Sequence, residues 1–171
     1  MVLKLALQQK SDILFSDPDV LVFQAPDEII QCIRDRAGCF FVEKNAYCVS
    51  DWIAKRASQL NLKLTKDFNA GVLFIPQHSM SIELCNALLE GWSPDVPDYF
   101  PEQTICDVLM TAAQARPLPT ESYVVDNRGM WFWESDADYQ PIKVRHFVGN
   151  VRHRMYISGY PMIKKAIESQ L

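Results

Sequence analysis

The sequence predicts an α/β fold in which a mixed, largely parallel sheet is flanked by helices. Short apolar runs rich in β-branched and aromatic residues alternate along the chain with amphipathic segments that begin at capping residues. Such alternation is typical of α/β proteins. The 171 residues, of which 49% are hydrophobic and 22% charged, suit one globular unit. We therefore expect a single domain over residues 1–171.

Strands are expected where short apolar runs are bounded by Gly, Pro, Asn, Asp or Ser. The clearest case is 142–147, where apolar and polar residues alternate in period two. The run 68–76 follows an Asn-Ala-Gly turn and is almost wholly apolar. The full set of expected strands is 13–15, 20–23, 39–42, 68–76, 122–126, 130–134 and 142–147.

Helices are expected where capping residues precede apolar residues spaced three and four apart. Ser50 or Asp51 begins one helix, and Ser79 or Ser81 begins another. Pro101 stands at the first position of a third, where its missing N–H costs nothing. The expected helices are 2–9, 26–34, 50–60, 79–89, 101–113 and one from about 161 to the C-terminus, which a loop precedes.

Composition limits the function classes. The net charge is −4, so an overall basic surface for nucleic acid is not expected. No apolar run reaches the roughly 18 residues of a membrane span, and polar residues 8–10 interrupt the N-terminal stretch too early for a signal peptide. The five cysteines show no CxxC spacing and read as reduced thiols. A cytoplasmic protein is expected.

Two aspartates, Asp17 and Asp19, end the first strand-like run in "ILFSDPDVLVF". On extended backbone these two side chains point the same way, and together they suit one hard divalent cation, Mn²⁺ or Mg²⁺. They also suit a catalytic aspartate pair. The alternative without chemistry is an Asx turn at a strand end.

Three more segments carry residues that could support chemistry. In "HFVGNVR", His146 offers a metal ligand, Gly149 close backbone approach and Arg152 a fork for phosphate oxygens, although a solvated basic loop explains the same pattern. The segment "FNAGVLFIP" places an amide and a glycine at the start of a strand, as a plain turn would. The segment "PEQTI" places a carboxylate in the first turn of a helix, where the helix dipole stabilises it.

Together, in this order, the four segments resemble the motifs of metal-dependent nucleotide-sugar glycosyltransferases of the A-type fold, in particular the glycogenin and bacterial galactosyltransferase group. In that family, an apolar strand ends in DxD. An NxG strand, a DQ helix start and a terminal HxxGxxK segment follow. The resemblance covers nearly all of this chain but only the C-terminal part of the family's domain.

The resemblance implies a reaction and a role for each motif. A sugar would pass from a nucleotide diphosphate donor, with UDP-sugars the expected class, to the hydroxyl of an unknown acceptor. The cofactor would be Mn²⁺ or Mg²⁺. The implied metal ligands are Asp17, Asp19 and His146. The implied donor- and sugar-binding residues are Lys10, Asn69, Ala70, Gly71, Gly149 and Arg152. The implied catalytic residues are Glu102 and Gln103.

The chain departs from the family pattern at three places. Glu102 stands where the family has Asp, and Arg152 stands where it has Lys. Only sixteen residues precede Asp17, whereas the family has a longer nucleotide-binding part there. We therefore expect a fragment or split form of the enzyme, with a separate chain as a candidate source of the missing part.

Two other functions fit part of the sequence. A haloacid-dehalogenase-like phosphatase would use Asp17 as nucleophile and Asp19 as acid. It also needs a late acidic pair, usually near a Gly-Asp step, for which "DADYQ" is a poor substitute, and it leaves "HFVGNVR" unexplained. A non-catalytic remnant could instead bind a partner protein, for example through Trp131 and Trp133, although such residues are most often core.

Overall fold

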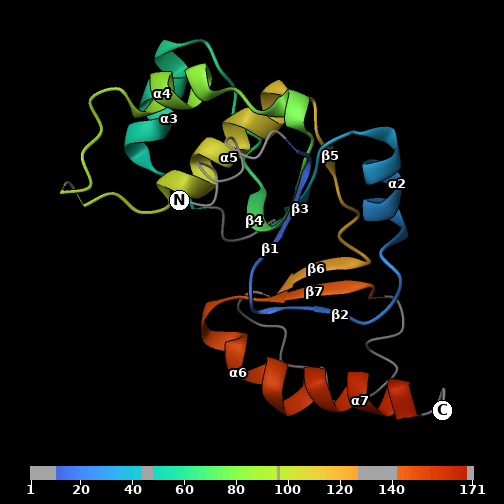
Figure 1. Cartoon of the computed structure of the whole chain (residues 1–171). Helices are drawn as coiled ribbons and strands as arrows, with labels where there is room; N and C mark the ends of the chain where they lie inside the picture. Colours follow the sequence, from blue (N-terminus) through green and yellow to red (C-terminus); the bar gives the residue numbers. More distant parts are fainter. Residues whose placement is uncertain (1–10, 44–47, 96, 127–141, 169–171) are drawn as a thin grey trace.

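The computed structural model describes residues 11–43, 48–95, 97–126 and 142–168, and this part of the chain forms two mixed sheets with helices around them (Figure 1). The expected α/β class is confirmed. The expected helix 2–9, the expected strand 130–134, Lys10 and the two tryptophans Trp131 and Trp133 lie outside the described residues. None of the described helices is long and apolar enough to cross a membrane.

The first sheet has four strands in the order β1-β4-β3-β5. These are β1 (Ile13–Ser16), β4 (Phe68–Ile75), β3 (Cys39–Val42) and the short β5 (Arg116–Pro117). The long strand β4 runs antiparallel to both of its neighbours, and only β3 and β5 are parallel.

The second sheet has the order β2-β7-β6, with β2 (Val20–Val22), β7 (Val144–Phe147) and β6 (Tyr123–Asp126). Strands β6 and β7 are parallel, and β2 and β7 are antiparallel. Antiparallel pairing therefore predominates among the described strands, so the expected largely parallel sheet is wrong. Consecutive strands can pair in parallel only through a long crossover connection, which is usually a helix packed on the sheet. The helix between β3 and β4 instead packs with other helices, as described next.

Helices cover both faces of the first sheet. Helix α5 (Pro101–Ala112) packs Cys106 and Met110 on one face. Helices α3 (Asp51–Gln59) and α4 (Ile82–Leu89) form a further layer outside α5. Figure 1 shows these three helices together, away from α2 (Asp27–Asp35).

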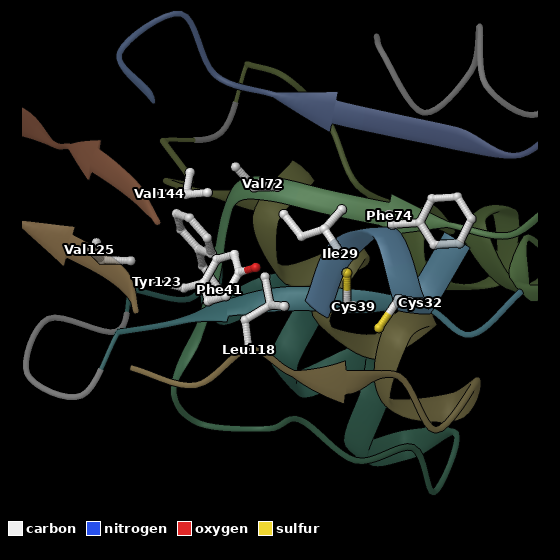
Figure 2. Close-up of a cluster of buried hydrophobic side chains, with 10 residues drawn as sticks. All are labelled: Ile29, Cys32, Cys39, Phe41, Val72, Phe74, Leu118, Tyr123, Val125 and Val144. Carbon is white, nitrogen blue, oxygen red and sulfur yellow. The ribbon is translucent and has the colours of Figure 1, made fainter. Parts of the chain in front are cut away.

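The opposite face of the first sheet forms a core that reaches the second sheet. Figure 2 shows Ile29 and Cys32 of α2 in front of the strands of the first sheet, with Tyr123 and Val144 of the second sheet to one side. This one cluster therefore joins α2 and both sheets. Its buried members are Ile29, Cys32, Cys39, Phe41, Val72, Phe74, Leu118, Tyr123, Val125 and Val144.

The segment after β7 is helical rather than the expected loop. A 3₁₀ turn (Gly149–Val151) leads through α6 (Arg152–Arg154) and a π-helical turn (Met155–Gly159) into α7 (Tyr160–Glu168). Pro161 lacks the N–H that a regular α-helix would use, and the wider π turn ends two residues before it. A Cβ on Gly159 would lie 2.6 Å from Leu21, so this helical segment rests closely on the second sheet.

Candidate metal centre

Asp17 and Asp19 lie where the chain crosses from the first sheet to the second. Asp17 directly follows β1, and its N–H donates to the carbonyl oxygen of Gly71 at 2.8 Å. Asp19 directly precedes β2, and its carbonyl oxygen accepts from the N–H of Phe147 at 2.9 Å. Backbone hydrogen bonds to both sheets thus fix the two carboxylates in place.

His146 of β7 completes the cluster, although it follows Asp19 by 127 residues. Its Nε2 lies 3.1 Å from Oδ1 of Asp19 and 3.5 Å from Oδ2 of Asp17. One ligand atom from each of the three residues lies within 4.8 Å of the others, an arrangement that could hold a metal ion. Asp19 and His146 are buried, whereas the Asp17 side chain is 36% exposed and leaves the cluster open on one side.

The Asn69 amide favours a proton on Nδ1 of His146. Nδ2 of Asn69 donates to Glu43 at 2.7 Å, and Oδ1 accepts from the N–H of Gly71 at 2.8 Å. The same Oδ1 lies 3.0 Å from Nδ1 of His146 and can only accept, so the amide favours a proton on Nδ1, while the Asp19 carboxylate, 3.1 Å from Nε2, competes for that proton when no cation is bound. With the proton on Nδ1, Nε2 points an unshared electron pair at the two carboxylates, which is the arrangement a metal ion requires.

Arg152 supplies a positive charge at the edge of the cluster. Its Nε donates to Oδ2 of Asp19 at 2.6 Å, while its side chain remains 62% exposed. Arg152 is the first residue of α6, directly after the 3₁₀ turn that begins at Gly149. The guanidinium can therefore hold Asp19 and still offer other N–H groups to an anion in solvent.

The electrostatics of the cluster favour a bound cation. Burial, and then the charge of Asp19, raise the pKa of Asp17 to about 6. Burial lowers the pKa of His146 despite the neighbouring Asp19 carboxylate. At neutral pH the centre thus combines two carboxylates and a neutral imidazole, and one cation would stabilise all three.

Gly71 makes room for the imidazole. A Cβ at this position would lie 2.0 Å from Nδ1 of His146 and 2.4 Å from its Cε1, far inside contact distance. Strand β4 is also irregular here, because Phe40 is opposite Leu73 whereas Phe41 is opposite Asn69. The bulge and the glycine together bring the strand close to His146.

The remaining motif residues lie at different distances from the cluster. Gln103 accepts from the N–H of Ala70 at 3.4 Å and donates to the carbonyl oxygen of Cys48 at 2.9 Å, so the start of α5 adjoins β4. Glu102 is exposed, and its charge contributes to the raised pKa of Asp17. Gly149 is exposed with φ +56°, and a Cβ there would meet no atom within 4 Å.

The motifs did not point to Glu43, which is buried and bonded to the Asn69 amide. It follows β3 directly and belongs to none of the four segments. The available signal was a carboxylate at the end of a strictly apolar strand, which is uncommon without a partner.

We expect the affinity for Mn²⁺ to rise with pH. Below about pH 6 the Asp17 carboxyl holds a proton that the cation must displace, so affinity should rise about tenfold per pH unit and level off near pH 7, where His146 is already neutral. Calorimetric titration with Mn²⁺ across this range measures it. An affinity independent of pH would contradict the assignment of Asp17 as a ligand.

The same pKa shift predicts the effect of pH on the metal-free chain. The folded state binds the Asp17 proton more tightly than the unfolded chain does. The contribution of Asp17 to the free energy of unfolding should therefore fall as pH rises from 3.8 to about 6. Mn²⁺ should therefore stabilise the protein most above that range.

No protein-family model matches the chain, and a search of curated proteins gives no significant match. The likeness to glycosyltransferases thus depends on the four motifs. The contacts just described are independent of that likeness, because they concern only where this chain places its own carboxylates, imidazole and guanidinium.

Proposed function

We propose that the chain binds a divalent cation, Mn²⁺ or Mg²⁺, together with the diphosphate of a nucleotide sugar, and serves as a glycosyltransferase or as the metal-binding part of a split one. The observation that supports this most is the convergence of Asp17, Asp19 and His146, with Arg152 beside them. Two carboxylates with one imidazole suit Mn²⁺ and Mg²⁺ better than they suit the softer metals that prefer thiolate ligands. UDP-sugars are the expected donors.

Each residue has a definite task in this proposal. Asp17, Asp19 and His146 hold the cation, which when bound supplies positive charge to the leaving diphosphate. Arg152 donates its outward N–H groups to a phosphate oxygen while Nε stays on Asp19. Gln103, which accepts from the N–H of Ala70, and the neighbouring Glu102 would contact the transferred sugar and the acceptor.

The contacts of Asp19 weigh against the phosphatase alternative. In that reaction Asp19 would have to carry and donate a proton. Here one of its oxygens accepts from Arg152 at 2.6 Å and the other lies 3.1 Å from His146. A guanidinium so close stabilises the ionised carboxylate, which suits a metal ligand better than an acid.

Thermal unfolding with Mn²⁺ and UDP, separately and together, tests the proposal. A ligand that binds only the folded state stabilises it by about 2.7 kcal/mol at one hundred times its Kd. We expect Mn²⁺ alone to raise the melting temperature and UDP to raise it further only when Mn²⁺ is present. Cooperative unfolding that neither addition shifts would contradict the proposal.

The variant Arg152→Ala distinguishes binding of the metal from binding of the diphosphate. The variant should keep most of the shift caused by Mn²⁺ and lose the additional shift caused by UDP, because its guanidinium is the proposed phosphate contact. Arg34→Ala, an exposed residue of α2, makes the same change outside the centre and should behave as wild type. A shift with Mn²⁺ but none with UDP, in wild type as in both variants, would leave a metal site without the proposed donor.

A further inference from the structure

One residue, Asn69, stands between Glu43 and the candidate metal ligand His146. Glu43 is buried, with 7% of its surface exposed. Its Oε2 accepts from Nδ2 of Asn69 at 2.7 Å. The N–H of Glu43 is fixed as well, since it donates to the carbonyl oxygen of Asp67 at 2.7 Å. The carboxylate is thus placed by the backbone beside the strand that carries Asn69.

A carboxylate can accept hydrogen bonds but cannot donate them when ionised, so it fixes the direction of the Asn69 amide. With Nδ2 turned to Glu43, only Oδ1 is left for His146, and this acceptor favours a proton on Nδ1 of the imidazole against the pull of the Asp19 carboxylate on Nε2. Nε2 is then the nitrogen free to bind the cation. The chain of contacts runs from Glu43 through Asn69 to His146 and ends at the two aspartates.

We infer that Glu43 is a positioning residue, which orients the Asn69 amide and thereby holds His146 in the tautomer that ligates metal. Carboxylates commonly do this by bonding a ligating histidine directly. Here the buried Asn69 amide lies between the Glu43 carboxylate and the His146 imidazole, so that Glu43 orients the amide and the amide orients the imidazole. The inference rests on the proposed metal centre for its purpose, but the tautomer itself can be measured without any metal.

The test is the ¹⁵N NMR spectrum of the imidazoles in the metal-free chain, followed by titration with Mn²⁺. The chain has three histidines, and the exposed His78 and His153 serve as internal references. In the wild type we expect Nδ1 of His146 to be protonated. In Glu43→Leu, which leaves the Asn69 amide without this acceptor, we expect a mixture of tautomers and about a 10- to 100-fold loss of Mn²⁺ affinity.

Glu43→Gln is the conservative variant, because its side-chain oxygen can still accept from Asn69. It should retain the wild-type tautomer and lose less affinity than Glu43→Leu. Glu83→Leu, on helix α4, makes the same change at an exposed position that contributes nothing to the cluster and should change neither readout.

Two results would overturn the inference. One is a wild-type His146 whose Nδ1 is unprotonated, which decides the matter even if Glu43→Leu does not fold. The other is a folded Glu43→Leu with the wild-type imidazole spectrum and Mn²⁺ affinity. If the wild type shows the expected tautomer and Glu43→Leu loses it, but the wild type binds no Mn²⁺, the positioning role stands and the proposed function fails.

Discussion

Asp19→Asn is expected to lose Mn²⁺ binding by more than about 100-fold while unfolding at the same temperature as the parent chain or above it. Asp19 is buried between Arg152 and His146, so the substitution removes a ligand charge at the centre of the cluster. The new amide can donate to the unshared pair on Nε2 of His146 and accept from Arg152 with its oxygen. The gain at His146 offsets the weaker, uncharged bond to Arg152, whereas the cation loses its ligand.

Calorimetric titration with Mn²⁺ and thermal unfolding of the metal-free variant check the two parts of this prediction. Asp95→Asn is the control, since this exposed residue bonds to Ser93 of its own loop and lies outside the cluster of metal ligands. A variant that unfolds at a much lower temperature and yet binds Mn²⁺ normally would make Asp19 a structural residue.

Gly71→Ala is expected to abolish the metal centre from a position that offers no ligand. Its Cβ would lie 2.0 Å from Nδ1 of His146 and 2.8 Å from Oδ1 of Asn69. Strand β4 is held between β1 and β3 and cannot retreat, so the imidazole must turn away from the aspartates. Overpacking of this kind costs about 1–3 kcal/mol of stability, and we expect the Mn²⁺ affinity to fall more than about 100-fold.

Gly38→Ala is the matched control for that loss. Its Cβ would lie 2.9 Å from Cε of Met110 and 3.0 Å from Cβ of Ala115, so it also overpacks the first sheet. It touches no residue of the metal centre, and it should lower stability without lowering the affinity for Mn²⁺. Equal losses of affinity in both variants, measured by titration, would show that general destabilisation explains the effect of Gly71→Ala.

Local pattern predicted most of the described elements, because caps and apolar spacing act within a few residues. Ser50 caps α3 by accepting from the N–H of Ile53, and Ser81 caps α4 by accepting from Leu84. Strand direction was not predictable in this way. It depends on which distant segment a strand meets, and the two aspartates give no sign that β1 and β2 belong to different sheets.

The cluster of Asp17, Asp19 and His146 was expected from the order of the motifs, and the structure brings these three together. Asn69 was expected to face a sugar, a role that stays a prediction, and the structure places its amide between Glu43 and His146. Periodicity could not show this, because the bulge in β4 changes which residues share a face.

The most direct test of the metal centre is a count of bound Mn²⁺ from the electron paramagnetic resonance signal of the free ion. In the wild-type chain at neutral pH, we expect one Mn²⁺ per molecule, lost in both Asp19→Asn and His146→Ala. Equal binding in the wild type and both variants, or none in a folded wild type, would contradict the assignment of these residues as metal ligands.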